Sequence, residues 1–506
     1  MTRPVALLAF ALLMAVTTVL YTSQLAQVPA YLMHDEVNFA LQAQAIGASA
    51  HDTNGRLLPV YFSEDGFAAG RDPIMIYVSA IWLAVRPLSD SAARLPTALT
   101  GVLSVVLMFL VGRRLFRSDA MAIVAAGLLA LTPAHFVNTR LALSITYPIP
   151  FILLWLWCLL SYLSSGDRRL LLGGGLALGV GVYAYVAGLF MMPLYLVFTV
   201  LIVRRDRHEL ASAAVLGFAV AMIPLVWWQF EHPDRYRNLL EAYQVRDAAA
   251  AASFPSRIAA YWMFFNPDYL FLSGDARLTN STRVAGLFPL SAAILIPVGL
   301  CHLWRGRAST IGWCVLAGFL TAPLATAISG RLEINRVLYA VPFGVLVAAF
   351  GVTALLSSRW WPVRLVTVAL LIGVVGQFGL VYAHYLNEYR VSSAPYFGGD
   401  ARGAVEEVLA RVKDGPVFLD SRTPIERYWR FYALAHAVPG LVGRPTYYDQ
   451  ELFSPSVPPI GALLVCTRGD RVCAAVSSQA EWRRVAARPE PDGSIVFEVF
   501  EKGQSE

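Results

Sequence analysis

The chain has little charge for its length. Charged residues make up 15% of its 506 residues, whereas 57% are hydrophobic; soluble domains carry about 25% charged residues. A water-soluble protein of this size could not bury so much apolar surface, so the composition excludes a soluble class. The apolar residues also come in separate blocks, each near the roughly 20 residues that cross a bilayer core as helix. The sequence therefore predicts a polytopic α-helical membrane protein.

Ionisable residues are nearly absent from these apolar blocks. An ion-coupled transporter usually carries acidic or basic side chains at membrane depth, because a charge that moves there needs a partner. A transporter or lipid flippase is also expected to show broken helices or paired halves, and neither is clear in the sequence. The polar residues gather in loops instead, which favours chemistry at a membrane face.

Lysine and cysteine are scarce as well. Lys413 and Lys502 are the only lysines, so arginine supplies most of the positive charge behind the net +6. In a soluble protein that charge would suggest nucleic acid. Here the arginines form short clusters between apolar blocks, as in cytoplasmic loops, so we expect no nucleic-acid partner. Of the five cysteines, Cys466 and Cys473 could pair if their region is oxidised, or remain free thiols.

The arginine clusters predict the topology. If every cluster is cytoplasmic, an even number of spans must separate neighbouring clusters. The clusters lie at residues 3, 113–117, 168–169, 204–207, 305–307 and 359–364. The apolar blocks that satisfy this rule lie near 5–21, 95–112, 119–134, 146–163, 170–186, 187–203, 210–228, 284–304, 310–328, 336–356 and 363–385. The result is about eleven spans over residues 1–386, with a cytoplasmic N-terminus.

One further apolar stretch, residues 73–88, would break this rule if it crossed the membrane. It is shorter than the others, and Arg71, Asp72, Arg86 and Pro87 crowd its ends. A stretch of that kind is typical of an interfacial or re-entrant segment. We therefore expect residues 22–94 to form one long outer loop with interfacial helices, and residues 229–283 to form a second outer loop.

The composition changes beyond residue 387. Charge and proline appear there, together with short apolar runs at 416–419, 462–465 and 494–497 that are bounded by glycine, proline or aspartate. Such runs are typical of strands. Residues 387–506 are therefore predicted to form a small extracytoplasmic α/β domain.

A pair of acidic residues opens the first outer loop. Asp35 and Glu36 follow His34 and precede apolar residues at helical spacing. Two carboxylates at the mouth of a span could provide a general base, and His34, Asp35 and Glu36 together could hold a divalent ion. Acidic residues also favour the first turn of a helix, so a solvated helix cap explains the pair equally well.

Arg71 and three further arginines in the predicted outer segments, Arg283, Arg331 and Arg336, are candidates for binding an anion; the last three run against the general charge bias. Arg71 lies where an interfacial helix is expected to begin, and a helix N-terminus beside an arginine suits an anion. The guanidinium fork matches the geometry of phosphate. Contact with lipid headgroups is the alternative for each of them.

Taken in order, these motifs resemble the GT-C membrane glycosyltransferases, in particular the bacterial branch of protein O-mannosyltransferases and aminoarabinose transferases. The resemblance is carried by Asp35-Glu36, Arg71-Asp72-Pro73-Ile74 and Arg140, and by residues 94–99, 112–116, 131–135, 266–286 and 335–342. Each motif is loose, and their order and spacing over about residues 1–390 give the specificity. The resemblance implies the GT-C fold.

What the resemblance implies about function is an inverting transfer of a hexose or pentose from a polyprenyl-phosphate carrier. The acceptor would be a glycan, lipid or protein at the outer face of a bacterial inner membrane. Asp35 matches the acid that takes the acceptor's proton, and Glu36 would orient the acceptor or support Asp35. Arg71 matches a basic residue that contacts the donor phosphate. Arg336, Arg331 and Arg283 are candidates for the same task.

The chain departs from the family's pattern at two places. The relatives' Lys-Pro-Pro-Leu is here Arg71-Asp72-Pro73-Ile74, and the glutamate that can precede it, a metal ligand in some relatives, is Gly70. A second acid, often found after the position of Arg140, is here Ile145. Use of a metal ion therefore stays open. A non-catalytic scaffold that presents its C-terminal domain to a partner stays an alternative, as does a transporter.

Overall fold

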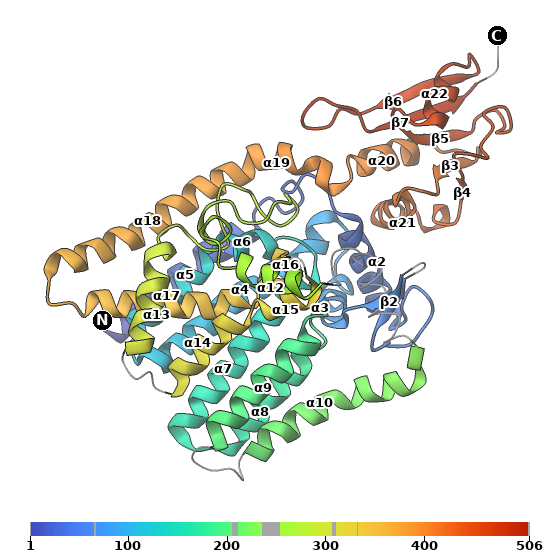
Figure 1. The fold of residues 1–506 in the computed structure, drawn as a ribbon. Helices are drawn as coiled ribbons and strands as arrows, with labels where there is room; N and C mark the ends of the chain where they lie inside the picture. Colours follow the sequence, from blue (N-terminus) through green and yellow to red (C-terminus); the bar gives the residue numbers. More distant parts are fainter. Residues whose placement is uncertain are drawn as a thin grey trace. The chain divides into compact units, whose positions relative to one another are not determined.

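The computed structural model describes residues 2–64, 67–204, 211–234, 253–305, 310–330 and 332–503 (Figure 1). The chain divides into two compact units. The first comprises Met1–Ser23, Ser49–Val78 and Leu95–Ala383, and the second comprises Gln24–Ala48, Ser79–Arg94 and His384–Glu506. The second unit therefore contains two pieces of the predicted first outer loop as well as the C-terminal region.

The first unit is built of helices. They are α1 (Arg3–Thr22), α4 (Asp90–Phe116, from Leu95 on), α5 (Asp119–Ala130), α6 (Pro133–Thr139), η1 (Ser144–Thr146), α7 (Pro148–Ser165), α8 (Arg168–Gly181), α9 (Gly188–Arg204), α10 (Ala211–Glu231), α12 (Phe254–Met263), η3 (Asp268–Leu272), α13 (Ala292–Arg305), α14 (Thr310–Thr321), α15 (Leu324–Ser329), α16 (Ile334–Val337), α17 (Ala340–Leu356) and α18 (Trp361–Leu386). A short antiparallel pair, β1 (Phe62–Glu64) and β2 (Phe67–Arg71), precedes α3 (Pro73–Leu83).

Helices α7, α8, α9 and α10 lie side by side in this unit (Figure 1). The closest approach is between α8 and α10, where small residues face each other. A Cβ atom on Gly175 would collide with the carbonyl oxygen of Ala214, and one on Gly217 would collide with that of Leu172. Such close backbone approach through glycine is typical of helices that pack in a membrane.

Six described helices are long and apolar enough to cross a membrane, and the α5–α6 pair, bent by 60°, would make a seventh. Helices α3, α9, α13 and α17 are apolar but shorter. Each of the eleven predicted blocks contains a helix, while the count of eleven crossings stays a prediction. The block predicted at 284–304 becomes helical only at Ala292, because the backbone amides of Leu287 and Phe288 bond to carbonyl oxygens of η3.

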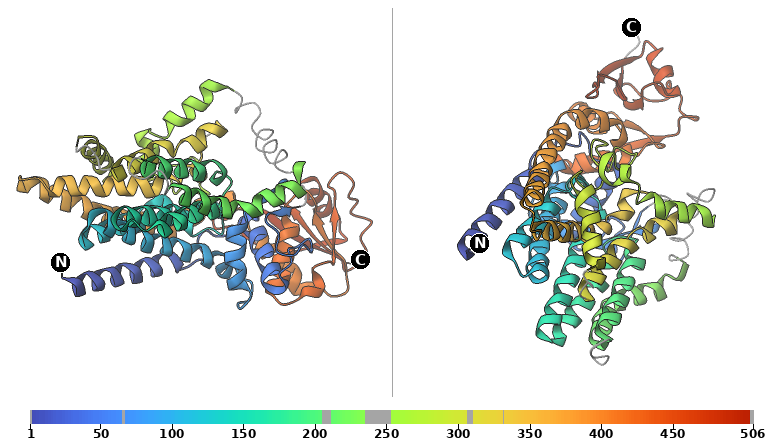
Figure 2. Two further views of the ribbon diagram at one scale, coloured as in Figure 1. Left: turned by 90° about the horizontal axis from the view of Figure 1, so that it is seen from below. Right: turned by 60° about the vertical axis from the view of Figure 1, so that its left-hand side comes forward.

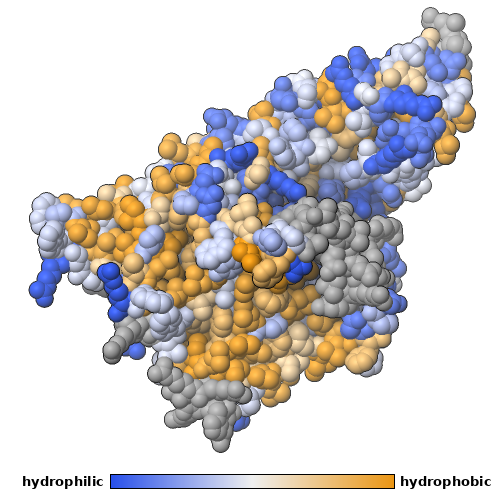
Figure 3. All heavy atoms as spheres, in the orientation of Figure 1, coloured by the Kyte–Doolittle hydropathy of each residue, from blue (hydrophilic) through white to orange (hydrophobic). Residues whose placement is uncertain are grey.

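Apolar side chains also cover much of the outer surface of these helices (Figure 3). Leu8 on α1 is 72% exposed, and Ile372 and Leu380 on α18 are 65% and 76% exposed. Exposing apolar area to water costs about 25 cal/mol per Å², so rows of such residues along long helices indicate contact with lipid. The chain is an integral, multi-pass membrane protein.

Helix α6 and the residue that follows it anchor the end of α1. Arg140, fully buried, donates hydrogen bonds to the carbonyl oxygens of Leu20 (2.9 Å), Tyr21 (2.9 Å) and Ser23 (2.7 Å). The Tyr21 hydroxyl lies 2.9 Å from Nδ1 of His135 on α6. The last carbonyls of a helix have no backbone partner within it, so Arg140 caps the C-terminal end of α1.

The second unit combines helices with a mixed sheet. Its elements are α2 (His34–Ser49), α19 (Glu388–Ser393), η4 (Ala394–Phe397), α20 (Ala401–Arg411), β3 (Val417–Asp420), α21 (Ile425–Ala435), η5 (Pro439–Leu441), β4 (Pro445–Tyr448), β5 (Leu463–Thr467), α22 (Arg471–Ser477), β6 (Trp482–Ala487) and β7 (Phe497–Lys502). The sheet order is β4-β3-β5-β7-β6, red in both views of Figure 2. Strand β3 is parallel to β4 and β5, whereas β7 is antiparallel to β5 and β6.

This sheet confirms that the C-terminal region is α/β. Strands β3 and β5 overlap the predicted runs at 416–419 and 462–465, each beginning one residue later. The run predicted at 494–497 is wrong by three residues, because β7 begins at Phe497. The carbonyls of Ser494 and Val496 accept hydrogen bonds from the amides of Glu490 and Arg468, so this segment forms a loop instead.

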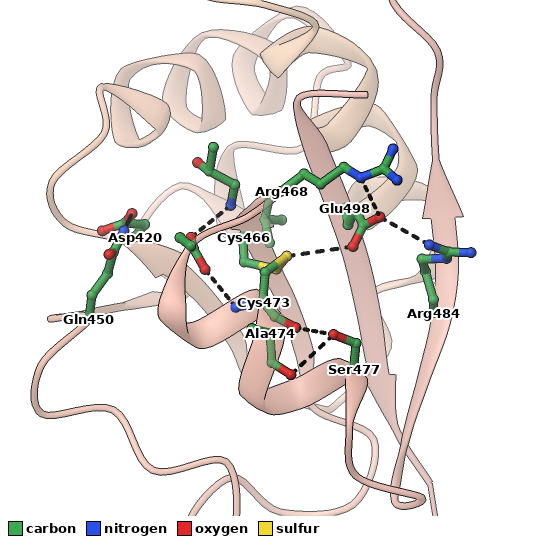
Figure 4. Close-up of a disulfide and its surroundings, with 12 residues drawn as sticks. Asp420, Gln450, Cys466, Arg468, Cys473, Ala474, Ser477, Arg484 and Glu498 are labelled. Atoms are coloured by element: carbon green, nitrogen blue, oxygen red, sulfur yellow. Dashed lines mark hydrogen bonds and ion pairs between the residues drawn. A yellow bond between two sulfur atoms is a disulfide. The ribbon is translucent and has the colours of Figure 1, made fainter. Parts of the chain in front are cut away.

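Cys466 on β5 and Cys473 on α22 form a disulfide (Figure 4). The carboxylate of Asp470 caps α22 by accepting a hydrogen bond from the amide of Cys473 at 2.6 Å. Both cysteines are buried in a core with Leu464, Trp482 and Phe500. Of the two alternatives that the sequence left open, the structure has the disulfide.

Candidate active site

The acidic pair lies at the start of α2, in the second unit. Helix α2 begins at His34, and Asp35 and Glu36 occupy its first turn. One carboxylate oxygen of Glu36 accepts a hydrogen bond from the backbone amide of Met33 at 2.9 Å. That contact satisfies an amide which the helix itself leaves without a partner. Glu36 therefore caps α2, as the alternative interpretation expected, but its side chain is buried rather than solvated.

Glu36 also forms a buried ion pair with Arg94. Nε and Nη2 of Arg94 donate to the two carboxylate oxygens at 2.8 and 2.9 Å, and the side chains are 1% and 0% exposed. Arg94 additionally donates to the carbonyl oxygens of Leu25, Pro29 and Tyr31 at 2.9, 3.0 and 2.6 Å. The pair thus fastens residues 25–31 to the starts of α2 and α4.

Asp35 has a different environment, although it is the next residue. Its side chain is 27% exposed, and its Oδ1 lies 3.4 Å from Nε2 of His34. Tyr428, whose hydroxyl donates to the carbonyl oxygen of Leu32 at 2.7 Å, is close enough that the charges of Glu36 and Asp35 add to the effect of burial in raising the pKa of Tyr428. Asp35 is therefore the member of the pair that keeps access to solvent.

The predicted metal ligands do not converge. Among the described residues, the ligand atoms of His34, Asp35 and Glu36 do not gather within 4.8 Å of one another. Both oxygens of Glu36 are engaged with Arg94. The cluster Cys466, Asp470 and Cys473 has the right spacing, but its sulfur atoms are joined in the disulfide. The geometry does not favour a three-ligand site on the first turn of α2.

Arg71 and Asp72 lie in the first unit, where β2 gives way to α3. The hydroxyl of Ser144 in η1 donates to Oδ2 of Asp72 at 2.9 Å. Burial raises the pKa of Asp72 to about 6, while the Ser144 hydrogen bond and the charge of Arg71 act in the opposite direction. The chain departs from the family's pattern at Asp72 and at Ile145. These two places lie close together, because Asp72 is hydrogen-bonded to Ser144, the residue before Ile145.

Arg336 lies on α16, which contacts η1 in the same unit. Its Nη2 is 3.5 Å from Oε2 of Glu333, the residue that precedes α16, and its side chain is 12% exposed. Its Nη1 is buried and has no hydrogen-bond partner in the described part of the chain; the same holds for Oδ1 of Asn335 and the hydroxyl of Tyr339. Buried polar atoms are normally paired, so this segment has donors and acceptors ready for a ligand.

The remaining outer arginines are less informative. Arg283 is exposed and has left-handed backbone with φ of 60°, and no described contact brings it to Arg71 or Arg336. Arg331 lies outside the described residues.

The loop around Arg283 is held in place by polar residues whose contacts no sequence motif indicated. Asn280 and Asn138 exchange hydrogen bonds: Nδ2 of Asn280 donates to Oδ1 of Asn138 at 2.8 Å, and Nδ2 of Asn138 donates to the carbonyl of Asn280 at 3.0 Å. Asp275 accepts from the amide of Ile334 at 2.9 Å. This loop therefore positions α16 and Arg336. Its sequence signal was only the cluster of polar residues in an outer loop.

Comparisons with known proteins bear on the fold. The fold matches crystal structures of ArnT from Cupriavidus metallidurans in the apo state and bound to undecaprenyl phosphate, each with a TM-score of 0.62 and 14% identity over 97% of both chains. It also matches the Archaeoglobus fulgidus oligosaccharyltransferase tethered with an acceptor peptide, with a TM-score of 0.54 and 11% identity over 98% of this chain and 74% of that one. No curated protein matches the chain by sequence.

These likenesses confirm the resemblance that the motifs indicated: the chain has the fold of the GT-C membrane glycosyltransferases. Within that class, the sequence model of the family described as dolichyl-phosphate-mannose-protein mannosyltransferase matches residues 71–228. The matched part begins at Arg71 and contains Arg94 and Arg140, which belong to the segments that carried the resemblance.

Proposed function

We propose that this protein is an inverting glycosyltransferase that moves a sugar from a polyprenyl-phosphate carrier to an acceptor. The observation that supports this most is the likeness to ArnT over 97% of both chains, since one of the matched structures holds undecaprenyl phosphate. The family match at residues 71–228, whose description names a lipid-phosphate sugar donor, points to the same donor class.

In this proposal Asp35 is the general base. It takes the proton of the acceptor's nucleophile as that atom attacks the anomeric carbon, and the bond from this carbon to the phosphate oxygen breaks with inversion. A base needs a side chain that the acceptor can reach. The side chain of Asp35 is 27% exposed and that of Glu36 is 0% exposed, so in this proposal Glu36 acts by holding the first turn of α2, together with Arg94.

Arg336 and Arg71 are proposed to stabilise the leaving lipid phosphate. As the bond breaks, negative charge grows on the phosphate, and donors placed there in advance stabilise it. Arg336 has a buried guanidinium nitrogen without a partner among the described residues, which is the feature expected of such a donor. Arg283 and Arg331 are secondary candidates. We assign no step to a divalent ion, because Glu36 is committed to Arg94.

The acceptor side is proposed to be the outer face of a bacterial inner membrane. The Cys466–Cys473 disulfide supports this, since disulfides persist in oxidising compartments and are rare in the cytosol. A C-terminal domain outside the cytoplasm also fits the cytoplasmic N-terminus and the odd number of spans expected from the arginine clusters.

The test is release of sugar from radiolabelled polyprenyl-phosphate sugars by the purified protein in lipid nanodiscs with an envelope extract as acceptor source. We expect one donor to be used, and Asp35→Asn to slow release by about 10²- to 10⁴-fold. Asp414→Asn, which removes an exposed carboxylate of the same unit, should match the unaltered protein. Full activity in Asp35→Asn would exclude it as the base. If no donor is bound or cleaved, the transporter or scaffold interpretation gains support.

A further inference from the structure

A cavity of about 710 Å³ opens in the first unit, where four helix ends meet. The C-terminal ends of α4 and α7 and the N-terminal ends of α5 and α14 surround it. Three arginines at the end of α4 line one side, Arg113, Arg114 and Arg117, and apolar side chains of α7 and α14 line another, Leu160, Leu163 and Ile311. None of these residues belongs to the candidate active site.

The charge in this cavity is only partly balanced. Nε of Arg113 lies 2.8 Å from Oδ1 of Asp119, and its guanidinium also lies over the ring of Phe109 at 5.7 Å. Arg114 and Arg117 are exposed and form no ion pair within the described chain. Among the described lining residues, Asp119 is the one that is acidic. Within the part of the chain that the structure describes, two positive charges therefore have no acidic partner beside the apolar wall.

We propose that this cavity binds the headgroup of an anionic phospholipid, with the phosphate on Arg114 and Arg117. The guanidinium fork donates two parallel hydrogen bonds to phosphate oxygens. Basic pockets between the ends of membrane helices suit anionic lipid headgroups. Leu160, Leu163 and Ile311 come from apolar helices and give the acyl chains an apolar wall to lie against. A free phosphate would leave this apolar wall unused.

The volume fits this ligand. Small-molecule sites commonly measure about 300–1,000 Å³, so 710 Å³ holds a glycerophosphate headgroup and the first part of its chains. A bound headgroup would tie α4 to α7 and α14 and would relieve the repulsion among the three arginines. The protein should therefore be more resistant to thermal unfolding when the lipid is bound.

The experiment uses the full chain purified in detergent, with phosphatidylglycerol or phosphatidylcholine added at equal concentration. Native mass spectrometry counts the bound lipid, and thermal unfolding measures its stabilising effect. The cavity variant is Arg114→Gln/Arg117→Gln. The control, Arg359→Gln/Arg364→Gln, removes two exposed arginines that do not line the cavity. A third variant, Leu163→Trp, fills the apolar side and keeps all the charges.

We expect phosphatidylglycerol to bind in preference to phosphatidylcholine, and its affinity to fall roughly 10- to 30-fold in the cavity variant, since each arginine near a membrane contributes about 1 kcal/mol to anionic-lipid binding. Leu163→Trp should also lose the lipid, and the control should keep it. The proposal fails if the control loses as much affinity, if both lipids bind equally, or if inorganic phosphate stabilises the protein as well as the lipid does. Sugar release should persist in all variants, which separates this site from the proposed active site.

Discussion

Two arginine–glutamate pairs, one in each unit, show how the same chemistry can be structural or functional. Arg94 donates two hydrogen bonds to Glu36, of 2.8 and 2.9 Å, and its remaining N–H groups donate to three backbone carbonyls. Nη2 of Arg336 lies 3.5 Å from Oε2 of Glu333, and Nη1 of Arg336 is buried without a partner in the described residues.

The difference lies in how completely each guanidinium is satisfied. A buried charge whose hydrogen bonds are all made leaves nothing for a ligand, and removing its partner is costly. A buried guanidinium with one unused donor loses a hydrogen bond to water and gains none in return. An anionic ligand would supply the missing acceptor. The first pair therefore holds the candidate base in place, and the second is a candidate site for the lipid phosphate.

The largest effect is expected from Arg94→Leu. This change leaves the Glu36 carboxylate buried without its partner and removes donors from three carbonyls, so the free energy of unfolding should fall by about 3–5 kcal/mol. Thermal unfolding in detergent, or yield of folded protein where the loss is too great to purify it, measures this. Arg336→Leu serves as the matched comparison. Equal losses of unfolding free energy in the two variants would contradict the proposed difference between the two pairs.

Arg336→Gln should lower the affinity for polyprenyl phosphate and change stability little. Its ion pair is long, so the free energy of unfolding should change by less than about 1 kcal/mol. Affinity for polyprenyl phosphate should fall roughly 10- to 100-fold, because a hydrogen bond to a charged group contributes about 1.5–3 kcal/mol. Equilibrium binding of labelled polyprenyl phosphate measures this, with the exposed Arg305→Gln as control. Unchanged affinity would remove Arg336 from the proposed site.

Asp72 gives a smaller effect that depends on pH. Burial raises its pKa to about 6, above the ordinary aspartate value of about 4. Between about pH 4 and 6 the folded state therefore holds more protons than the unfolded state. The contribution of Asp72 to stability is present below pH 4, is lost as the pH rises to 6, and is constant above that. Melting temperatures measured from pH 4 to 7.5 should show a smaller decline in Asp72→Asn, and parallel curves would contradict the assignment.

Arg283→Gln should have the smallest effect. The side chain is exposed and no described contact joins it to Arg336, so affinity for polyprenyl phosphate should change by less than about threefold, as for other exposed charges. The binding assay used for Arg336→Gln applies here. A loss as large as that of Arg336→Gln would show that exposure is a poor guide to which arginines contact the donor.

Much of the helical architecture followed from local patterns. Each predicted apolar block contains a helix, α2 begins at His34 beside the acidic pair, and the short stretch at 73–88 contains α3, with 11 residues. Local patterns were weaker in the C-terminal region, where β7 began later than expected and where β4 and β6 were missed. Strands depend on partners distant in the chain, whereas the hydrogen bonds of a helix are local.

The candidate site was only partly predictable. The sequence placed Asp35 and Glu36 side by side and gave both a catalytic role, and nothing in it indicated that Arg94, 58 residues away, would occupy both oxygens of Glu36. The position of Asp72 beside Ser144 was equally hidden. Side chains far apart in sequence meet only when the chain packs. That packing decides whether all the hydrogen-bonding groups of a carboxylate or guanidinium find partners.

By itself, then, the sequence determined the class of protein. Long uncharged blocks can cross a membrane only as helices, because each backbone group must find its partner inside its own segment, and the order of the loop motifs indicated the GT-C fold. The tertiary structure decided how deeply each charged residue is buried and what it contacts. It paired Glu36 with Arg94, left Asp35 partly exposed and left Arg336 with a buried donor that has no partner among the described residues, since the satisfaction of a buried charge depends on neighbours that only the folded chain brings together.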